Sequence, residues 1–123
     1  MLFLLSPAKT LDYDTPVPPT LAKRATRPRY VDEATALIDV LRGYTPAGIA
    51  SLMELSDPLA QLNVARYAAW STRFSSANSR PAALAFNGDV YEGLQAATLS
   101  EADWTWAQRH VVILSGLYGL LKP

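Results

Sequence analysis

The sequence VVILSGLYGLLKP, residues 111–123, places a short apolar segment directly before a glycine-containing turn. Residues 111–114 carry no polar side chain, which is typical of a strand that is buried on both faces of a sheet. Residues 2–5 and residues 82–86 have the same continuous apolar character. The pattern predicts that these three segments are strands of one sheet.

Helical signals separate the three predicted strands. Apolar side chains recur at helical spacing between Val31 and Leu41. Three further segments begin with residues that are typical of helix N-caps, namely Thr45, Ser56 or Asp57, and Ser100. Because strands and helices alternate along the chain, we expect an α/β fold with a small, largely parallel sheet flanked by helices.

Composition excludes several kinds of site. The 123 residues contain 11 basic and 11 acidic side chains, no cysteine and one histidine, His110. Without cysteine there is no disulfide, thiolate zinc site or cysteine nucleophile, and one histidine cannot form a two-histidine metal site. We therefore expect no catalytic residue, metal or cofactor. No segment has the length of a signal peptide's apolar region or a membrane span, so we expect a cytoplasmic protein without a membrane partner.

Small polar residues follow each predicted strand at its carboxyl end. In open parallel sheets, ligands bind outside the carboxyl ends of the strands, where loop backbone groups are free. We expect one shared edge that suits a polar or anionic ligand and is formed by Ser6, Lys9, Asn87, Asp89, Ser115 and Tyr118. The structural alternative is that small residues simply form good turns, with Asp89 capping the helix that follows.

Three interpretations remain open for the turn from Gly116 to Gly119. Its backbone N–H groups could bind a phosphate, as glycine-containing loops after strands do in nucleotide-binding proteins. It could instead be the turn of a helical hairpin, which approaches a DNA backbone through N–H to phosphate bonds. A plain turn explains the same residues.

Basic residues concentrate in a proline-rich loop, residues 11–29. Lys23, Arg24, Arg27 and Arg29 lie together in this loop with no acidic residue among them. Four cations in a restrained loop could contact phosphates, although a charged run is often only a solvated surface. On the helix that begins near Asp57, Asn63, Arg66 and Trp70 share one face. These side chains could bind a base or a phosphate, or could anchor the helix to its neighbours.

Four segments, taken together, resemble the YaaA family of bacterial peroxide-stress proteins: LLSPAKTLDYD, LMELSDPLAQLNVARYAAW, LAFNGDVYEGLQA and LSGLYGLLKP. The resemblance runs in order from Met1 to Pro123. Family chains are about twice as long as this one, so residues 1–123 are expected to be the N-terminal half of a YaaA-like domain, an incomplete part of a larger single domain. We also expect that the uncovered last strand could pair with another copy of the chain.

The resemblance implies a role in surviving hydrogen peroxide by limiting free intracellular iron and so protecting DNA. It further implies a basic cleft, a helix-hairpin-helix-like element and DNA binding, with no established catalytic activity. The family's motif positions add Thr10, Asn63 and Tyr91 to the expected ligand edge.

The first interpretation is therefore a DNA-binding stress protein. Its expected nucleic-acid contacts are Lys9, Lys23, Arg24, Arg27, Arg29, Arg66, Gly116, Gly119 and Lys122. The alternative is an enzyme that acts on an unidentified small anionic substrate at the strand-end loops, with Lys9 in its site.

Overall fold

The computed structural model describes residues 1–123 and forms two compact units. Unit 1 comprises Met1–Tyr30 and Phe74–Pro123, and unit 2 comprises Val31–Arg73. Unit 1 contains a sheet with short helices, and unit 2 contains only helices. The predicted α/β class is confirmed.

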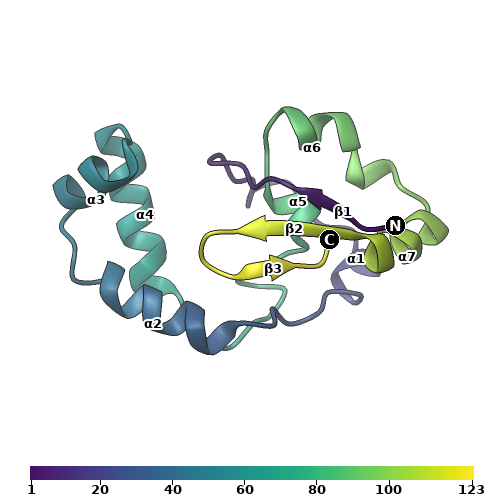
Figure 1. Ribbon diagram of the computed structural model, residues 1–123, viewed down its shortest axis with the longest axis horizontal. Coiled ribbons are helices and arrows are strands. Elements are labelled where there is room, and N and C mark those ends of the chain that lie inside the picture. Colours follow the sequence, from purple (N-terminus) through teal and green to yellow (C-terminus); the bar gives the residue numbers. More distant parts are fainter. The chain divides into compact units, whose positions relative to one another are not determined.

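The sheet of unit 1 has three strands in the order β1-β2-β3, with β2 in the centre (Figure 1). β1 is Phe3–Leu5, β2 is Val111–Ser115 and β3 is Gly119–Leu121. β1 and β2 are parallel, with Leu5 opposite Ile113, whereas β2 and β3 are antiparallel. Two of the three predicted strands are confirmed. The third strand of the sheet was not predicted, because it consists of only three residues after a glycine.

The prediction of a strand over residues 82–86 is wrong. Ala82–Ala85 forms a short helix, α5, and only Phe86 is in an extended bridge, antiparallel to Leu11. Alanine is the best helix former, and Pro81 immediately before the helix is compatible with a helix start. Ala83 and Ala85 are buried. The apolar character of this segment therefore reflects a helix within the core.

The expectation that residues 2–5 are buried on both faces is also wrong. Phe3 is 42% exposed and Leu4 is 59% exposed. Among the strand's side chains, Leu5 packs against the core cluster of unit 1. A continuous apolar run therefore predicted the strand here but not the burial of its side chains.

The other helices of unit 1 are short and lie between β1 and β2 in the sequence: α1 (Pro19–Ala22), α6 (Asp89–Leu94), the 3-10 helix η1 (Ala96–Thr98) and α7 (Glu101–His110). The prediction that Ser100 caps a helix is confirmed. Its hydroxyl accepts a hydrogen bond from the Asp103 N–H, and the Asp103 carboxylate accepts one from the Ser100 N–H, which is a capping box.

The core of unit 1 combines the central strand with side chains from four helical segments. Ile113 of β2 is fully buried and clusters with Ala83, Tyr91, Ala96 and Trp104. Burial of apolar surface is the main stabilising contribution in such a cluster. The cluster therefore fixes α5, α6 and α7 against the sheet.

Unit 2 consists of α2 (Val31–Leu41), α3 (Pro46–Met53) and α4 (Asp57–Ala69). The predicted N-cap at Thr45 is confirmed, since its hydroxyl accepts a hydrogen bond from the Gly48 N–H. Ile38 and Ile49 are fully buried. Arg42 donates to the carbonyls of Tyr67 and Trp70 at the end of α4, at 2.9 and 2.7 Å, which ties α2 to α4.

No helix of the chain combines the length and the apolar composition that crossing a bilayer requires.

Candidate functional site

The carboxyl ends of β1 and β2 lie at the same edge of the sheet, because the two strands are parallel. Ser6 follows β1 directly, and Ser115 is the last residue of β2. The Tyr91 hydroxyl donates a hydrogen bond to the Ser6 carbonyl at 2.5 Å. The Ser115 hydroxyl accepts one from the Tyr118 N–H at 3.1 Å. The Ser115 hydroxyl is thus engaged in its own turn, whereas at Ser6 the backbone carbonyl makes the hydrogen bond.

The loop after β1 contacts the turn at Asn87 through backbone hydrogen bonds. The Asn87 N–H donates to the Thr10 carbonyl at 3.0 Å, and the Asp12 N–H donates to the Ala85 carbonyl at 2.7 Å. A Cβ added to Gly88 would come within 3.2 Å of the Ala8 Cβ. The structure therefore brings Asn87 beside Thr10 although residues 82–86 are not a strand.

Lys9 and Asp89 do not form an ion pair with each other, and both side chains are exposed. Asp89 is the first residue of α6, and the N-cap is Gly88. A carboxylate in the first turn of a helix interacts favourably with the helix dipole. The position of Asp89 is thus explained by its helix and needs no contact with Lys9.

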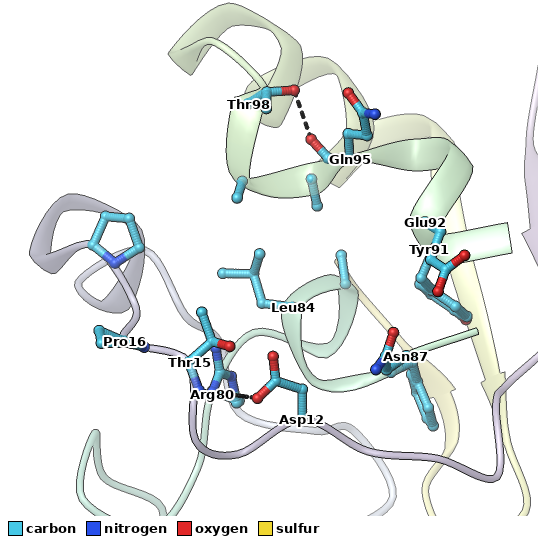
Figure 2. Close-up of a pocket in the computed structure, with 15 residues that line it drawn as sticks. Asp12, Thr15, Pro16, Arg80, Leu84, Asn87, Tyr91, Glu92, Gln95 and Thr98 are labelled. Carbon is cyan, nitrogen blue, oxygen red and sulfur yellow. Dashed lines mark hydrogen bonds and ion pairs between the residues drawn. The ribbon is translucent and has the colours of Figure 1, made fainter. Parts of the chain in front are cut away.

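A pocket of about 300 Å³ lies beside this loop, between residues 12–18 on one side and α5, α6 and η1 on the other. Leu84, Phe86, Ala96 and Pro16 contribute apolar surface to it. Figure 2 shows Asp12 and Arg80 next to each other on one side of the pocket, with Asn87, Glu92 and Gln95 further round its lining. Of the residues expected at the ligand edge, Asn87 and Tyr91 line this pocket.

Arg80 is the most buried charged group that lines the pocket. Its side chain is only 6% exposed, and its Nη1 lies 3.9 Å from the Oδ1 of Asp12. Its Nε is buried and has no hydrogen-bond partner in the chain. Hydrogen bonding from Thr15, through its side chain and its backbone N–H, lowers the pKa of Asp12 to about 2. Asp12 is therefore a carboxylate at neutral pH.

Sequence reasoning missed both Asp12 and Arg80. Asp12 carries a local signal, since its Oδ1 accepts hydrogen bonds from the N–H groups of Asp14 and Thr15, as aspartate does in turns. Arg80 carries no such signal, because 68 positions separate it from Asp12 and only the fold brings the two together.

The proline-rich loop, residues 11–29, is called the basic loop below. Its four cations, Lys23, Arg24, Arg27 and Arg29, are all exposed, and none forms an ion pair with a carboxylate. Arg24 donates to the Glu101 carbonyl and to the Thr105 hydroxyl of α7, at 3.4 and 3.1 Å. Arg27 lies 5.8 Å from the centre of the Phe74 ring, and Arg29 lies 5.9 Å from that of Tyr30. α1 interrupts the predicted loop just before these residues.

The remaining predicted residues are distributed between the two units. Asn63 and Arg66 belong to α4 of unit 2, where the Asn63 amide donates to the Leu59 carbonyl of its own helix at 2.8 Å. Gly116 and Gly119 border the turn between β2 and β3. This turn therefore belongs to a β-hairpin and is not the turn of a helical hairpin. Lys122 follows β3 and is exposed.

The chain has no group of three or more His, Cys, Asp or Glu side chains that could hold a metal ion. Self-association through the last strand also stays a prediction. Val111–Ser115 is paired on both sides within the chain, whereas β3, the last strand of the chain, is at an edge of the sheet.

The protein belongs to the α/β class, because its small mixed sheet has helices inserted between its first two strands. Its candidate site is the pocket beside the loop after β1. Residues 1–123 match the family described as peroxide stress protein YaaA, and the chain belongs to that family.

Relatives with the printed name UPF0246 protein extend the comparison. Those of Paracidovorax citrulli and Bordetella petrii are 63% and 61% identical to this chain over 123 residues. One of Burkholderia lata is 58% identical over the same length. Each alignment covers all of this chain but only 47%, 47% and 46% of the relative, respectively. The chain thus spans about half the length of the curated relatives it matches.

Proposed function

We propose that the protein acts in the cytoplasm during peroxide stress, binds DNA and limits the damage that intracellular iron causes to it. Membership of the peroxide stress family supports the general role. The observation that carries the DNA-binding part is the set of four exposed cations in the basic loop that have no carboxylate partner. Such cations are available to phosphates without first breaking an ion pair.

Two of these cations are oriented by the surrounding structure. Arg24 is held against α7 by two hydrogen bonds, and Arg27 lies near the Phe74 ring. A guanidinium that is already oriented loses less conformational entropy when it binds a phosphate. Lys23, between α1 and Arg24, has an exposed side chain without a hydrogen bond or ring contact and adds a flexible charge.

The net charge of the chain is zero, so the protein as a whole does not attract DNA. Affinity would depend on the local positive charge of the basic loop, and it would fall steeply as salt rises, because each neutralised phosphate releases counterions. Salt dependence is therefore the property that distinguishes phosphate contacts from a solvated charged surface.

The test is fluorescence anisotropy of the full-length protein with labelled duplex DNA at several salt concentrations. The variant Lys23→Ala/Arg24→Ala/Arg27→Ala/Arg29→Ala removes the four cations together. We expect it to flatten the slope of log affinity against log salt by roughly three to four units, at about 0.9 per phosphate.

Arg109→Ala serves as the matched control, because Arg109 is exposed and lies outside the basic loop. We expect a slope close to that of the wild type. An unchanged slope in the fourfold variant would mean that these residues do not contact phosphates, and the proposed DNA interface would then be wrong.

The iron part needs a separate measurement in cells that lack the gene. Two quantities are measured after a peroxide pulse: free iron, by electron paramagnetic resonance, and the number of DNA lesions. Both are compared between cells that lack the gene and cells in which the wild-type gene or the fourfold variant has been restored. We expect the wild type to lower both quantities. Equal free iron with and without the wild-type protein would contradict the proposed effect on iron, whatever the result for DNA binding.

A further inference from the structure

The pocket beside α5 and α6 contains a largely buried guanidinium whose Nε has no hydrogen-bond partner within the chain. Arg80 has a side chain that is 6% exposed, and its contact with Asp12 is a 3.9 Å ion pair. A guanidinium is always protonated in proteins and carries five N–H donors. Its Nε is buried without a partner.

Such an arrangement is costly unless another group supplies acceptors. Buried charges in proteins are normally paired and hydrogen-bonded, because removing an ion from water costs several kcal/mol. Arg80 lines the pocket, so a bound molecule with an oxygen or nitrogen acceptor can reach its guanidinium. The first requirement on the ligand is therefore an acceptor.

The other charges of the lining argue against a phosphate or another anion. Asp12 lies next to Arg80, and Glu92 also lines the pocket. These two carboxylates outweigh the one guanidinium, so an anion would add to an existing negative excess. An uncharged ligand avoids this repulsion and can also donate a hydrogen bond to Asp12. The second requirement is therefore a donor next to the acceptor.

The rest of the lining suits a flat ring. Leu84, Ala96 and Pro16 offer apolar surface, and the side-chain amide of Asn87 adds a donor and an acceptor to the lining (Figure 2). A volume of about 300 Å³ is at the small end of ligand pockets. We propose that this pocket binds an uncharged nucleobase, with Arg80 donating to an acceptor on the base edge and Asp12 accepting from an adjacent N–H.

Two sources supply this chemistry, a free nucleoside or an unpaired base of a nucleic-acid strand. Enzymes that take a base out of the stack read its pairing edge by hydrogen bonds in a similar pocket. The strand source rests on the DNA binding proposed above, whereas the nucleoside source does not.

The test is isothermal titration calorimetry of the full-length protein with guanosine, whose O6 acceptor lies beside its N1–H donor. We expect saturable binding. We expect 1-methylguanosine, which lacks that donor, to bind the wild type roughly 10-fold to 100-fold more weakly than guanosine does. We expect the same loss of affinity when guanosine is titrated into Arg80→Gln or Asp12→Asn. Arg109→Gln, which removes an exposed charge outside the pocket, should bind as the wild type does.

A single-stranded oligonucleotide measured with the same variants distinguishes the sources. Weaker oligonucleotide binding by Arg80→Gln, at an unchanged salt slope, supports the base of a strand, and unchanged oligonucleotide binding supports a free nucleoside. Absence of guanosine binding to the wild type would overturn the proposal, as would equal affinity for guanosine and 1-methylguanosine. The proposal would also be overturned if the wild type bound inorganic phosphate instead of guanosine and Arg80→Gln lost that binding. The results with guanosine, 1-methylguanosine and phosphate do not depend on the basic loop.

Discussion

The hydroxyl of Tyr91 donates a hydrogen bond to the carbonyl oxygen of Ser6. The bond joins α6 to the residue that follows β1, across 85 positions of sequence. Tyr91 is 7% exposed and also lies against Phe86, with 5.5 Å between the ring centres. Burial raises the pKa of Tyr91, so the hydroxyl stays protonated and remains a donor at neutral pH.

Tyr91→Phe removes this donor and keeps the ring. The Ser6 carbonyl would lose its partner, so we expect a loss of about 1 kcal/mol in the free energy of unfolding, measured by urea denaturation. Tyr44→Phe is the matched control, because Tyr44 is exposed and makes no side-chain hydrogen bond. Equal stability of Tyr91→Phe and the wild type would show that this bond does not stabilise the end of β1.

Gly119 is required by the turn between β2 and β3. Its φ is +70°, and a Cβ would lie 3.1 Å from the Cδ2 of Tyr30. We expect Gly119→Ala to lower the free energy of unfolding by roughly 1–3 kcal/mol, since both the backbone conformation and the contact become unfavourable. Gly116→Ala, with open space at its Cβ, should change stability little. A reversed order of the two variants would contradict this account of the hairpin.

The helix cap at Ser100 gives a smaller expected effect. Ser100→Ala removes the hydroxyl that accepts from the Asp103 N–H and should cost about 1 kcal/mol in urea denaturation. Ser76→Ala, at an exposed serine without a hydrogen bond from its side chain, is the control. An equal decrease in the free energy of unfolding in both variants would mean that the capping box does not stabilise α7.

Asp12 predicts a specific pH dependence. Its pKa falls from 3.8 to about 2 on folding, so its contribution to stability is complete above pH 3.8 and is lost as the pH falls through about 2. Carboxyl chemical shifts from NMR should place its midpoint near 2. Thr15→Val removes the first cause of the shift and should move the midpoint upward towards 3.8. A midpoint that does not move in this variant would contradict the role of Thr15.

Local signals in the sequence were sufficient for several elements. Thr45, Ser56 and Ser100 precede helices as predicted, because N-cap preferences depend on residues within one turn. The β2 strand was identified from its apolar residues. Residues 82–86 were misassigned because a run of five apolar residues does not distinguish a buried strand from a buried helix. The alanines of this run decide for the helix.

Long-range pairing limited what the sequence could predict about the site. The approach of Asn87 to Thr10 was expected from a parallel strand, but it arises from backbone hydrogen bonds beside the Leu11–Phe86 bridge. The proximity of Arg80 to Asp12 depends on the whole path of the loop and α5, so no local pattern indicates it. The exposed state of the basic loop likewise depends on which carboxylates the fold places nearby.

The central claim is that the basic loop contacts DNA, and hydrogen–deuterium exchange of the full-length protein with and without a short duplex tests it most directly. We predict slower amide exchange in residues 23–29 when DNA is bound, with no change in the last turn of α7, where Arg109 lies. Saturating DNA that leaves exchange in residues 23–29 unchanged, while slowing it elsewhere, would contradict the claim and would place the DNA interface on another surface.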